Sequence, residues 1–218
     1  MVIPVNKPPV TTGSRTTALS DSDEEIRVRI VQAALAAFAE RGFHGTSIPE
    51  IAAVAKVGVA SIYRRFVSKE ALVNAVFRET KGRLRDALLL GLDFSAAPRP
   101  LFFEVWTRLI RFQRAEPLAF QFLEMQDHVP YLDGESRAVE RSVLEPLLAS
   151  AQGASVEAGS ALSAPVVMAM IWGSFVGLTK AQRLGYLALD EASLLRAGEV
   201  CFAALTMSVM GTVTAPPT

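Results

Sequence analysis

The segment 57–69, VGVASIYRRFVSK, gathers side chains that bind phosphate groups and base edges. Ala60, Tyr63 and Arg64 are spaced i, i+3, i+4, so on a helix they share one side. An arginine pairs bidentately with a phosphate or with guanine O6 and N7, and a tyrosine hydroxyl commonly bonds phosphate. The small residue at position 60 would let the helix backbone come close to a groove wall. The pattern favours nucleic-acid contact, and the alternative is a tight helical connection with solvated arginines.

The distribution of charge agrees with such a contact. The 218-residue chain has a net charge of zero, but residues 26–69 hold seven basic and two acidic side chains, a local charge of +5. The remainder of the chain therefore carries −5. A basic unit beside an acidic remainder often marks nucleic-acid binding.

Few residues are available for metal, redox or catalytic chemistry. Cys201 is the one cysteine, and His44 and His128 are the two histidines, so we expect no disulfide within the chain, no metal site and no cofactor. Both histidines stand near turn signals and are expected at the surface. No Ser/His/Asp or Cys/His arrangement, phosphate-binding glycine loop or carboxylate pair indicates an enzyme.

Two segments bear on location. Residues 1–22 are rich in Pro, Thr and Ser and lack the apolar core of a signal peptide, so we expect a disordered arm on a cytoplasmic protein. Residues 158–179 carry no charge and reach the length of a membrane span. Pro165, three serines and three glycines favour a buried helix of a soluble protein over that alternative.

The hydrophobic periodicity after residue 22 is helical and strand alternation is absent, so the expected fold class is all-α. Capping boxes at Ser22/Glu25 and Ser47/Glu50 should begin the first two helices, and Pro146 should kink or split a later one. The expected helices cover 23–41, 48–55, 59–66, 68–90, 101–115, 117–127, 134–152, 164–184 and 190–211.

The helices at 48–55 and 59–66 are short and joined by a tight turn, which is the helix-turn-helix pattern. Val57, Ile62 and Phe66 would pack this unit onto the first helix. We expect a DNA-binding domain at 23–72, a connecting helix that continues to about residue 91, and a helical bundle at 92–212.

Residues 26–72 resemble the N-terminal domain of TetR/AcrR-family transcriptional regulators. The resemblance lies in FAERGFHGTSIPEIA, VGVASIY, RRF and SKEAL. The family pattern has F-A-E-R-G-F, then T-S, then a G-V-x-x-G-T-L-Y-x-x-F turn and recognition helix, then S-K-E-A-L. The resemblance implies a regulator of transcription, in particular a repressor released from its operator by a small-molecule effector, rather than an enzyme.

Carried over residue by residue, the resemblance implies ten DNA contacts: Thr46, Ser47, Gly58, Val59, Ala60, Ser61, Tyr63, Arg64, Arg65 and Lys69. The first two would contact phosphate, residues 58–61 would open the recognition helix, and Tyr63 and Lys69 would clamp the DNA backbone. Arg64 and Arg65 could serve base or phosphate. Lys56 stands where the family usually has a glycine at positive φ, which implies strain or an altered turn.

Small residues form stripes on the last two expected helices. One stripe is Ala169, Gly173, Gly177 and Ala181, and the other is Ala197, Cys201, Ala204 and Ser208. From spacing alone, the stripes fit packing within one chain as well as packing between two subunits. The family resemblance implies a homodimer, and with it a pseudo-palindromic operator on double-stranded DNA.

Aromatic side chains gather in the middle of the chain, where the resemblance implies an effector pocket. The expected pocket residues are Phe103, Trp106, Phe120, Glu124, Met125, Trp172 and Phe175, and an apolar effector is the expectation. Aromatics at helical spacing are also what an ordinary core requires. The alternative functions are an all-α enzyme or a helical interaction module that uses this central region.

Overall fold

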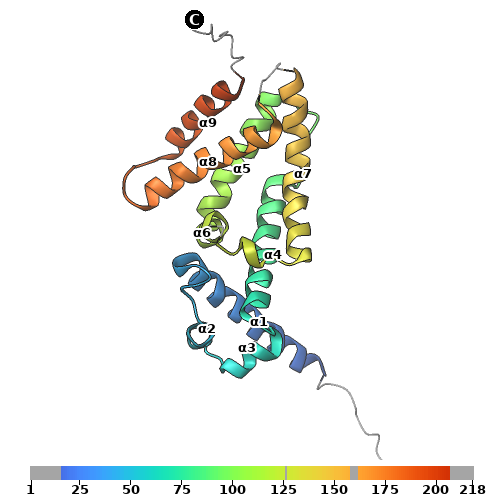
Figure 1. The fold of residues 1–218 in the computed structure, drawn as a ribbon, viewed down its shortest axis with the longest axis vertical. Helices are drawn as coiled ribbons and strands as arrows, with labels where there is room; N and C mark the ends of the chain where they lie inside the picture. The colour runs from blue at the N-terminus through green and yellow to red at the C-terminus, as the bar shows by residue number, and fades with distance from the viewer. Residues whose placement is uncertain (1–15, 126, 158–161, 207–218) are drawn as a thin grey trace, which may run out of the picture.

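The computed structural model describes residues 16–125, 127–157 and 162–206, and within these ranges every regular element is helical. The fold class is therefore all-α, as the periodicity predicts. Figure 1 shows α1, α2 and α3 at one end of the molecule and α8 and α9 toward the other, with α4 leading from one to the other.

The first three helices enclose a small core. They are α1 (Thr16–Arg41), α2 (Ile48–Ala55) and α3 (Val59–Arg65). Ile30, Phe38 and Ile51 are almost completely buried, and so is Ile62 of α3. These residues recur at helical spacing on one face of each helix, so their burial fixes how the three helices cross.

The beginning of α1 differs from the sequence-based prediction. The helix begins at Thr16 and runs through Ser22, so the capping box at Ser22 and the disordered arm over residues 16–22 are both wrong. Because no proline or glycine stands between Thr16 and Ser22, nothing local stops the helix there. The rest of the expected arm, residues 1–15, lies outside the described residues.

The remaining helices form a bundle: α4 (Lys69–Leu89), α5 (Pro98–Ala115), α6 (Pro117–Met125), α7 (Gly134–Glu157), α8 (Ala164–Arg183) and α9 (Glu191–Thr206). A 3-10 turn, η1 (Val129–Tyr131), joins α6 to α7. Ser68 caps α4 by accepting a hydrogen bond from the Ala71 N–H. Pro146 lies inside α7, which continues past it, so of the predicted kink or split the split is wrong.

Candidate nucleic-acid interface and effector cleft

Helix α3 is held by its apolar side and presents its polar side to solvent. Ile62 is 0% exposed and Phe66 is buried, so these two side chains fix the helix on the core. Ala60 and Arg64 are exposed, and Tyr63 is 50% exposed. Gly58 is the N-cap and contributes no side chain there, which leaves the beginning of the helix open to a close approach.

The two consecutive arginines of α3 have different surroundings. Arg64 is exposed and donates a hydrogen bond of 2.8 Å from Nη2 to the Ser61 hydroxyl, one turn earlier on the same helix. Its guanidinium is therefore oriented along the outer face of α3 while several N–H groups stay available. This geometry suits contact with a base edge or a phosphate.

Arg65 is turned toward the protein. Its guanidinium is paired with the Asp23 carboxylate of α1 and donates a second hydrogen bond to the Ser61 carbonyl oxygen. The side chain is only 14% exposed. Arg65 thus fastens α3 to α1. It could contact DNA, as expected from the sequence, only if its ion pair with Asp23 broke.

Thr46 also has a different place from the one expected. Its side chain is buried, and its hydroxyl donates to the carbonyl oxygens of Ala37 and Gly42. The hydroxyl therefore closes the turn after α1 and does not face solvent, which contradicts a phosphate contact by this side chain.

Ser47 is exposed at the beginning of α2 and forms the predicted capping box with Glu50. The Ser47 N–H and hydroxyl both donate to the Glu50 carboxylate, and these hydrogen bonds lower the pKa of Glu50. Arg41 pairs with the same carboxylate. The beginning of α2 is therefore rigid and exposed, as a phosphate contact requires.

Lys56 keeps the turn between α2 and α3 in its left-handed form. It is the C-cap of α2 with φ 55° and ψ 48°, and it is the one described non-glycine residue at positive φ. A left-handed conformation costs an L-residue roughly 1–2 kcal/mol. The expected strain is present, and the turn geometry that usually needs glycine is retained.

Lys69 lies where the turn after α1 meets the bundle. Its ammonium lies 4.2 Å from the centre of the Phe43 ring, and the same ring stacks on Tyr131 at 4.1 Å. The Tyr131 hydroxyl lies 3.1 Å from Nε2 of His44. These residues come from α4, the turn after α1 and η1, so one contact cluster joins all three.

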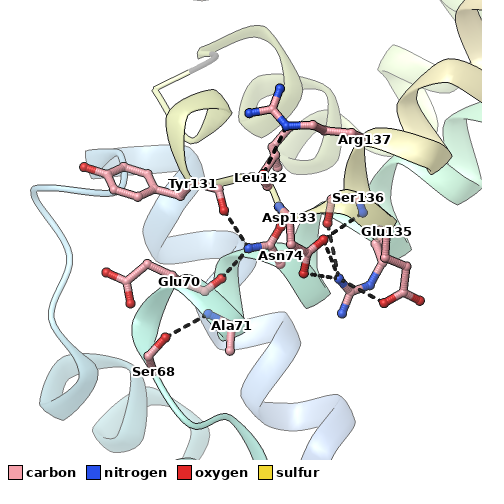
Figure 2. Close-up of polar contacts among 11 residues, drawn as sticks. Ser68, Glu70, Ala71, Asn74, Tyr131, Leu132, Asp133, Glu135, Ser136 and Arg137 are labelled. Carbon is pink, nitrogen blue, oxygen red and sulfur yellow. Dashed lines mark hydrogen bonds and ion pairs between the residues drawn. The ribbon is translucent and has the colours of Figure 1, made fainter.

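Asn74 of α4 holds the segment that follows η1 (Figure 2). Its amide donates to the carbonyl oxygens of Glu70 and Tyr131, both at 2.8 Å, and its own oxygen accepts from the Asp133 N–H. Arg78, one turn further along α4, pairs with Asp133. A buried asparagine with all these partners fixes the 131–133 backbone against α4.

Asp127 makes a second connection between the two parts of the chain. Its carboxylate accepts a 2.6 Å hydrogen bond from the Phe43 N–H. A Cβ on Gly42 would lie 2.3 Å from the same carboxylate, and Gly42 has φ +71°, so a side chain there would be strained and would displace the carboxylate. The turn after α1 is therefore tied to the α6–η1 loop.

His128 is buried, and its predicted surface position is wrong. It is 2% exposed and stacks on Phe122 with ring centres 4.4 Å apart. Burial lowers the pKa of His128 to about 4; Asp127 works against this shift and Lys81 adds to it. Sequence reasoning missed this residue because its turn signals do not reveal that the loop folds against α4.

The aromatic residues of the expected pocket mostly fill the core. Trp106, Phe120 and Phe175 are almost completely buried, and Phe175 contacts both of the others edge to face, with ring centres 5.2 Å and 5.5 Å apart. The Trp106 indole N–H donates to the Leu194 carbonyl oxygen, and Gly198 leaves room for the ring. These side chains stabilise α5, α6, α8 and α9 against each other. Trp106 and Phe175 do not line the cleft described next, whereas Phe120 does.

The other expected pocket residues lie around this core. Trp172 packs on Phe120, Phe103 contacts Arg99 and Phe102, and Met125 is 38% exposed. Glu124 is ion-paired with Arg183.

A cleft of about 270 Å³ lies between α5, α6 and α8. Its polar lining residues are Gln113, Arg114, Gln121, Thr179, Gln182 and Arg183, and its apolar ones are Pro117 and Phe120. Of the expected pocket residues only Phe120 lines it. The cleft is therefore more polar than the sequence led us to expect, and five of its lining side chains carry a guanidinium or a carboxamide.

The small-residue stripe of α8 faces solvent. Ala169, Gly173 and Gly177 are exposed and Ala181 is partly buried, and an added Cβ on either glycine would meet no atom within 4 Å. On α9, Ala197 and Cys201 pack partly against the core. The side chain of Ala204 and all of Ser208 lie outside the described residues.

Helix α8 is long and apolar enough to cross a membrane by length and composition, and 22% of its apolar window is buried. The prediction of a buried helix is therefore wrong for a single chain. A core helix of a soluble protein passes the same test of length and composition.

Comparison with known proteins covers the part of the chain that holds this interface. Residues 30–76 match the family described as bacterial regulatory proteins, tetR family. Over 53 residues, 24% of this chain and 28% of the relative, the chain is 49% identical to the HTH-type transcriptional repressor Rv3405c of Mycobacterium tuberculosis. Over 69 residues, 32% of this chain and 31% of the relative, it is 42% identical to the HTH-type transcriptional regulator RutR of Escherichia coli. The chain thus spans less than a third of the length of these curated relatives.

The fold extends the likeness beyond the matched residues. A TetR-family transcription regulator from Marinobacter aquaeolei has a TM-score of 0.72 at 22% identity, over 85% of this chain and 98% of that one. At this identity the likeness concerns the fold. Residues 30–76 are therefore similar to the tetR family of bacterial regulatory proteins, and 85% of the chain shares the fold of the Marinobacter aquaeolei regulator.

Proposed function

We propose that the chain represses transcription as a homodimer that binds a pseudo-palindromic DNA operator, and that a small-molecule effector releases it. The observation that carries DNA binding is the outer face of α3, where Tyr63 and an oriented Arg64 are exposed beside Ala60 and an open N-cap. Val59 is the first residue of α3, and Ser47 and Lys69 stand at the beginnings of α2 and α4. Such an exposed face favours a DNA-binding regulator over an enzyme.

The exposed stripe of α8 supports the homodimer. Val166 and Met170 are each 44% exposed beside Ala169 and Gly173, so an apolar surface with small side chains is left uncovered in one chain. A second copy of α8 could approach this surface closely. In a two-fold dimer the two recognition helices would then reach successive major grooves, roughly 34–36 Å apart.

The dimer is tested by measuring the molar mass in solution by light scattering. Gly173→Glu should yield the monomer, because its carboxylate would be buried in the interface, whereas an added Cβ at this position meets no atom within 4 Å in one chain. Gly153→Glu is the matched control, since Gly153 is an exposed helical glycine of α7 with the same free space. A monomeric parent, or a dimer that Gly173→Glu leaves intact, would remove this part of the proposal.

DNA binding is tested by fluorescence anisotropy with duplex DNA at two salt concentrations. Affinity should fall by orders of magnitude between about 50 and 200 mM salt if several cations contact phosphates. The alternatives of an all-α enzyme or a helical interaction module predict no salt-dependent affinity for DNA.

The effector is proposed to enter from the cleft between α5, α6 and α8. The central aromatic side chains are packed against each other, so a purely apolar effector in their midst has no support from the described cavity. A ligand that prefers one dimer conformation would shift the population away from the DNA-binding one.

A further inference from the structure

We infer that the cleft between α5, α6 and α8 binds a small organic carboxylate, and that α6 transmits this binding to α1. The inference deepens the proposed function by giving the chemical class of the effector, and it rests on that function. Its starting point is the lining of the cleft, which contains two guanidinium groups and no carboxylate.

Arg114 and Arg183 are each held in place by a carboxylate that does not line the cleft. Arg183 binds the Glu124 carboxylate through Nη2, and Arg114 binds the Glu191 carboxylate through Nη1. Each of these hydrogen bonds uses one of the five N–H groups of a guanidinium. The remaining N–H groups can bind a second carboxylate, and the existing pairs hold the side chains in place before the ligand arrives.

The rest of the lining suits the other parts of a small acid. Gln121 and Gln182 donate their amide N–H groups to the carbonyl oxygens of Ala39 and Leu189. Their own amide oxygens thus remain as acceptors for a hydroxyl or amide on the ligand. Pro117 and Phe120 supply an apolar surface for its carbon skeleton. The volume of about 270 Å³ lies just below the usual range of roughly 300–1,000 Å³ for ligand pockets, which favours a small molecule.

Helix α6 connects the cleft to the DNA-binding end. Gln121 lines the cleft and binds Ala39 in the last turns of α1 at 2.6 Å. Phe122, on the same helix, packs on Phe38 of α1. Just beyond α6, Asp127 holds the Phe43 N–H. A ligand that shifts α6 therefore acts on α1 through contacts that already exist, provided that it binds the two positions of α6 with different affinity.

The experiment is isothermal titration of the full chain with benzoate and hexanoate and with their neutral amides, benzamide and hexanamide. We expect saturable binding of at least one carboxylate and binding at least tenfold weaker for its amide. The same carboxylate should lower the affinity for duplex DNA. Absence of binding by both carboxylates, or equal binding of acid and amide, would overturn the inference.

The double variant E124Q/R183Q tests the site. The Glu124 side chain is only 3% exposed, so removing Arg183 alone would leave a buried carboxylate without its ion-pair partner. The double variant removes the Arg183 guanidinium and this carboxylate together. We expect it to lose carboxylate binding at least tenfold, whereas Arg111→Gln, on an exposed arginine of α5 outside the cleft, should bind like the parent. Unchanged binding by the double variant would overturn the site.

Duplex DNA binding without any carboxylate is measured in parallel. A chain that binds DNA but no carboxylate contradicts the inference alone. A chain that binds no DNA contradicts the proposed function.

Discussion

The Asp127 carboxylate holds the Phe43 N–H at 2.6 Å, across 84 positions of sequence, and so fastens the turn after α1 to the bundle. Gly42 beside it leaves the space that this carboxylate occupies. The orientation of α1 to α3 relative to the bundle therefore depends in part on this charge-assisted hydrogen bond, beside the hydrogen bond from Gln121 to Ala39 and apolar packing.

We predict that Asp127→Ala lowers operator affinity about fivefold, which corresponds to ~1 kcal/mol for one hydrogen bond. The reason is that a looser DNA-binding end must be ordered when it binds. Anisotropy titrations with an operator duplex would measure the change. Asp93→Ala is the control, because the Asp93 carboxylate accepts from Ser95 within a distant loop and should leave the affinity unchanged.

The two arginines of α3 should respond differently to substitution. Arg64→Ala is expected to cost about 1–3 kcal/mol of operator binding and to relax the choice of base at one position of each half-site. Arg65→Ala should instead lower Tm, because it breaks the pair with Asp23. Competition with single-base operator variants and thermal unfolding measure the two effects. Equal loss of base discrimination in both variants would show that Arg65 leaves Asp23 to contact DNA.

Lys56 offers a test of backbone strain. Replacing it by glycine should stabilise the fold by about 0.5–1 kcal/mol, since relief of the left-handed strain exceeds the entropy cost of glycine. Thermal unfolding should show a Tm higher by about 1–4 °C. Lys56→Ala, which removes the same charge and keeps the strain, should show no such gain. If alanine stabilised the protein as much as glycine, the effect would arise from charge and not from φ.

The buried His128 predicts a fall of stability in mild acid. The pKa of His128 is lowered from 6.5 to about 4 by burial, so the unfolded chain takes up a proton at a higher pH than the folded one. The stabilisation from neutral His128 is full above pH 6.5 and is lost as the pH falls toward 4, by up to about 3 kcal/mol.

Denaturant unfolding between pH 7 and pH 4 measures this loss. His128→Phe, which keeps an aromatic ring between Phe77 and Phe122, should have a shallower pH dependence. The facing charged groups, Asp127 and Lys81, remain in both proteins. Identical pH profiles would assign the loss of stability to other groups.

Local signals in the sequence predict the helices well. The bounds of α2 agree with the structure because Ser47, Glu50 and a near-terminal proline act within one turn of the helix beginning. Ser68 likewise caps α4 through a contact within one turn of the helix beginning. At the beginning of α1 the capping-box pattern at Ser22 is misleading, because the helix continues through it to Thr16, and the predicted boundary is wrong by several residues.

The candidate site is less predictable because partners distant in sequence decide it. The residues next to Arg65 in the sequence do not show that it pairs with Asp23, 42 positions away. Those next to Thr46 do not show that its hydroxyl donates to the Ala37 carbonyl oxygen of α1. The space around an aromatic residue is equally hidden, so Trp106 and Phe175 looked like pocket residues although they are core. Tyr63 and Arg64 were predictable since their helical spacing alone places them on the outer face.

Selection of bound duplexes from a random DNA pool tests the central claim most directly. The account predicts enrichment of one sequence with two-fold symmetry by the parent chain, and relaxed base preference in both half-sites with Arg64→Ala. Recovery of no enriched sequence by the parent, under salt conditions where the fold is intact, would contradict it.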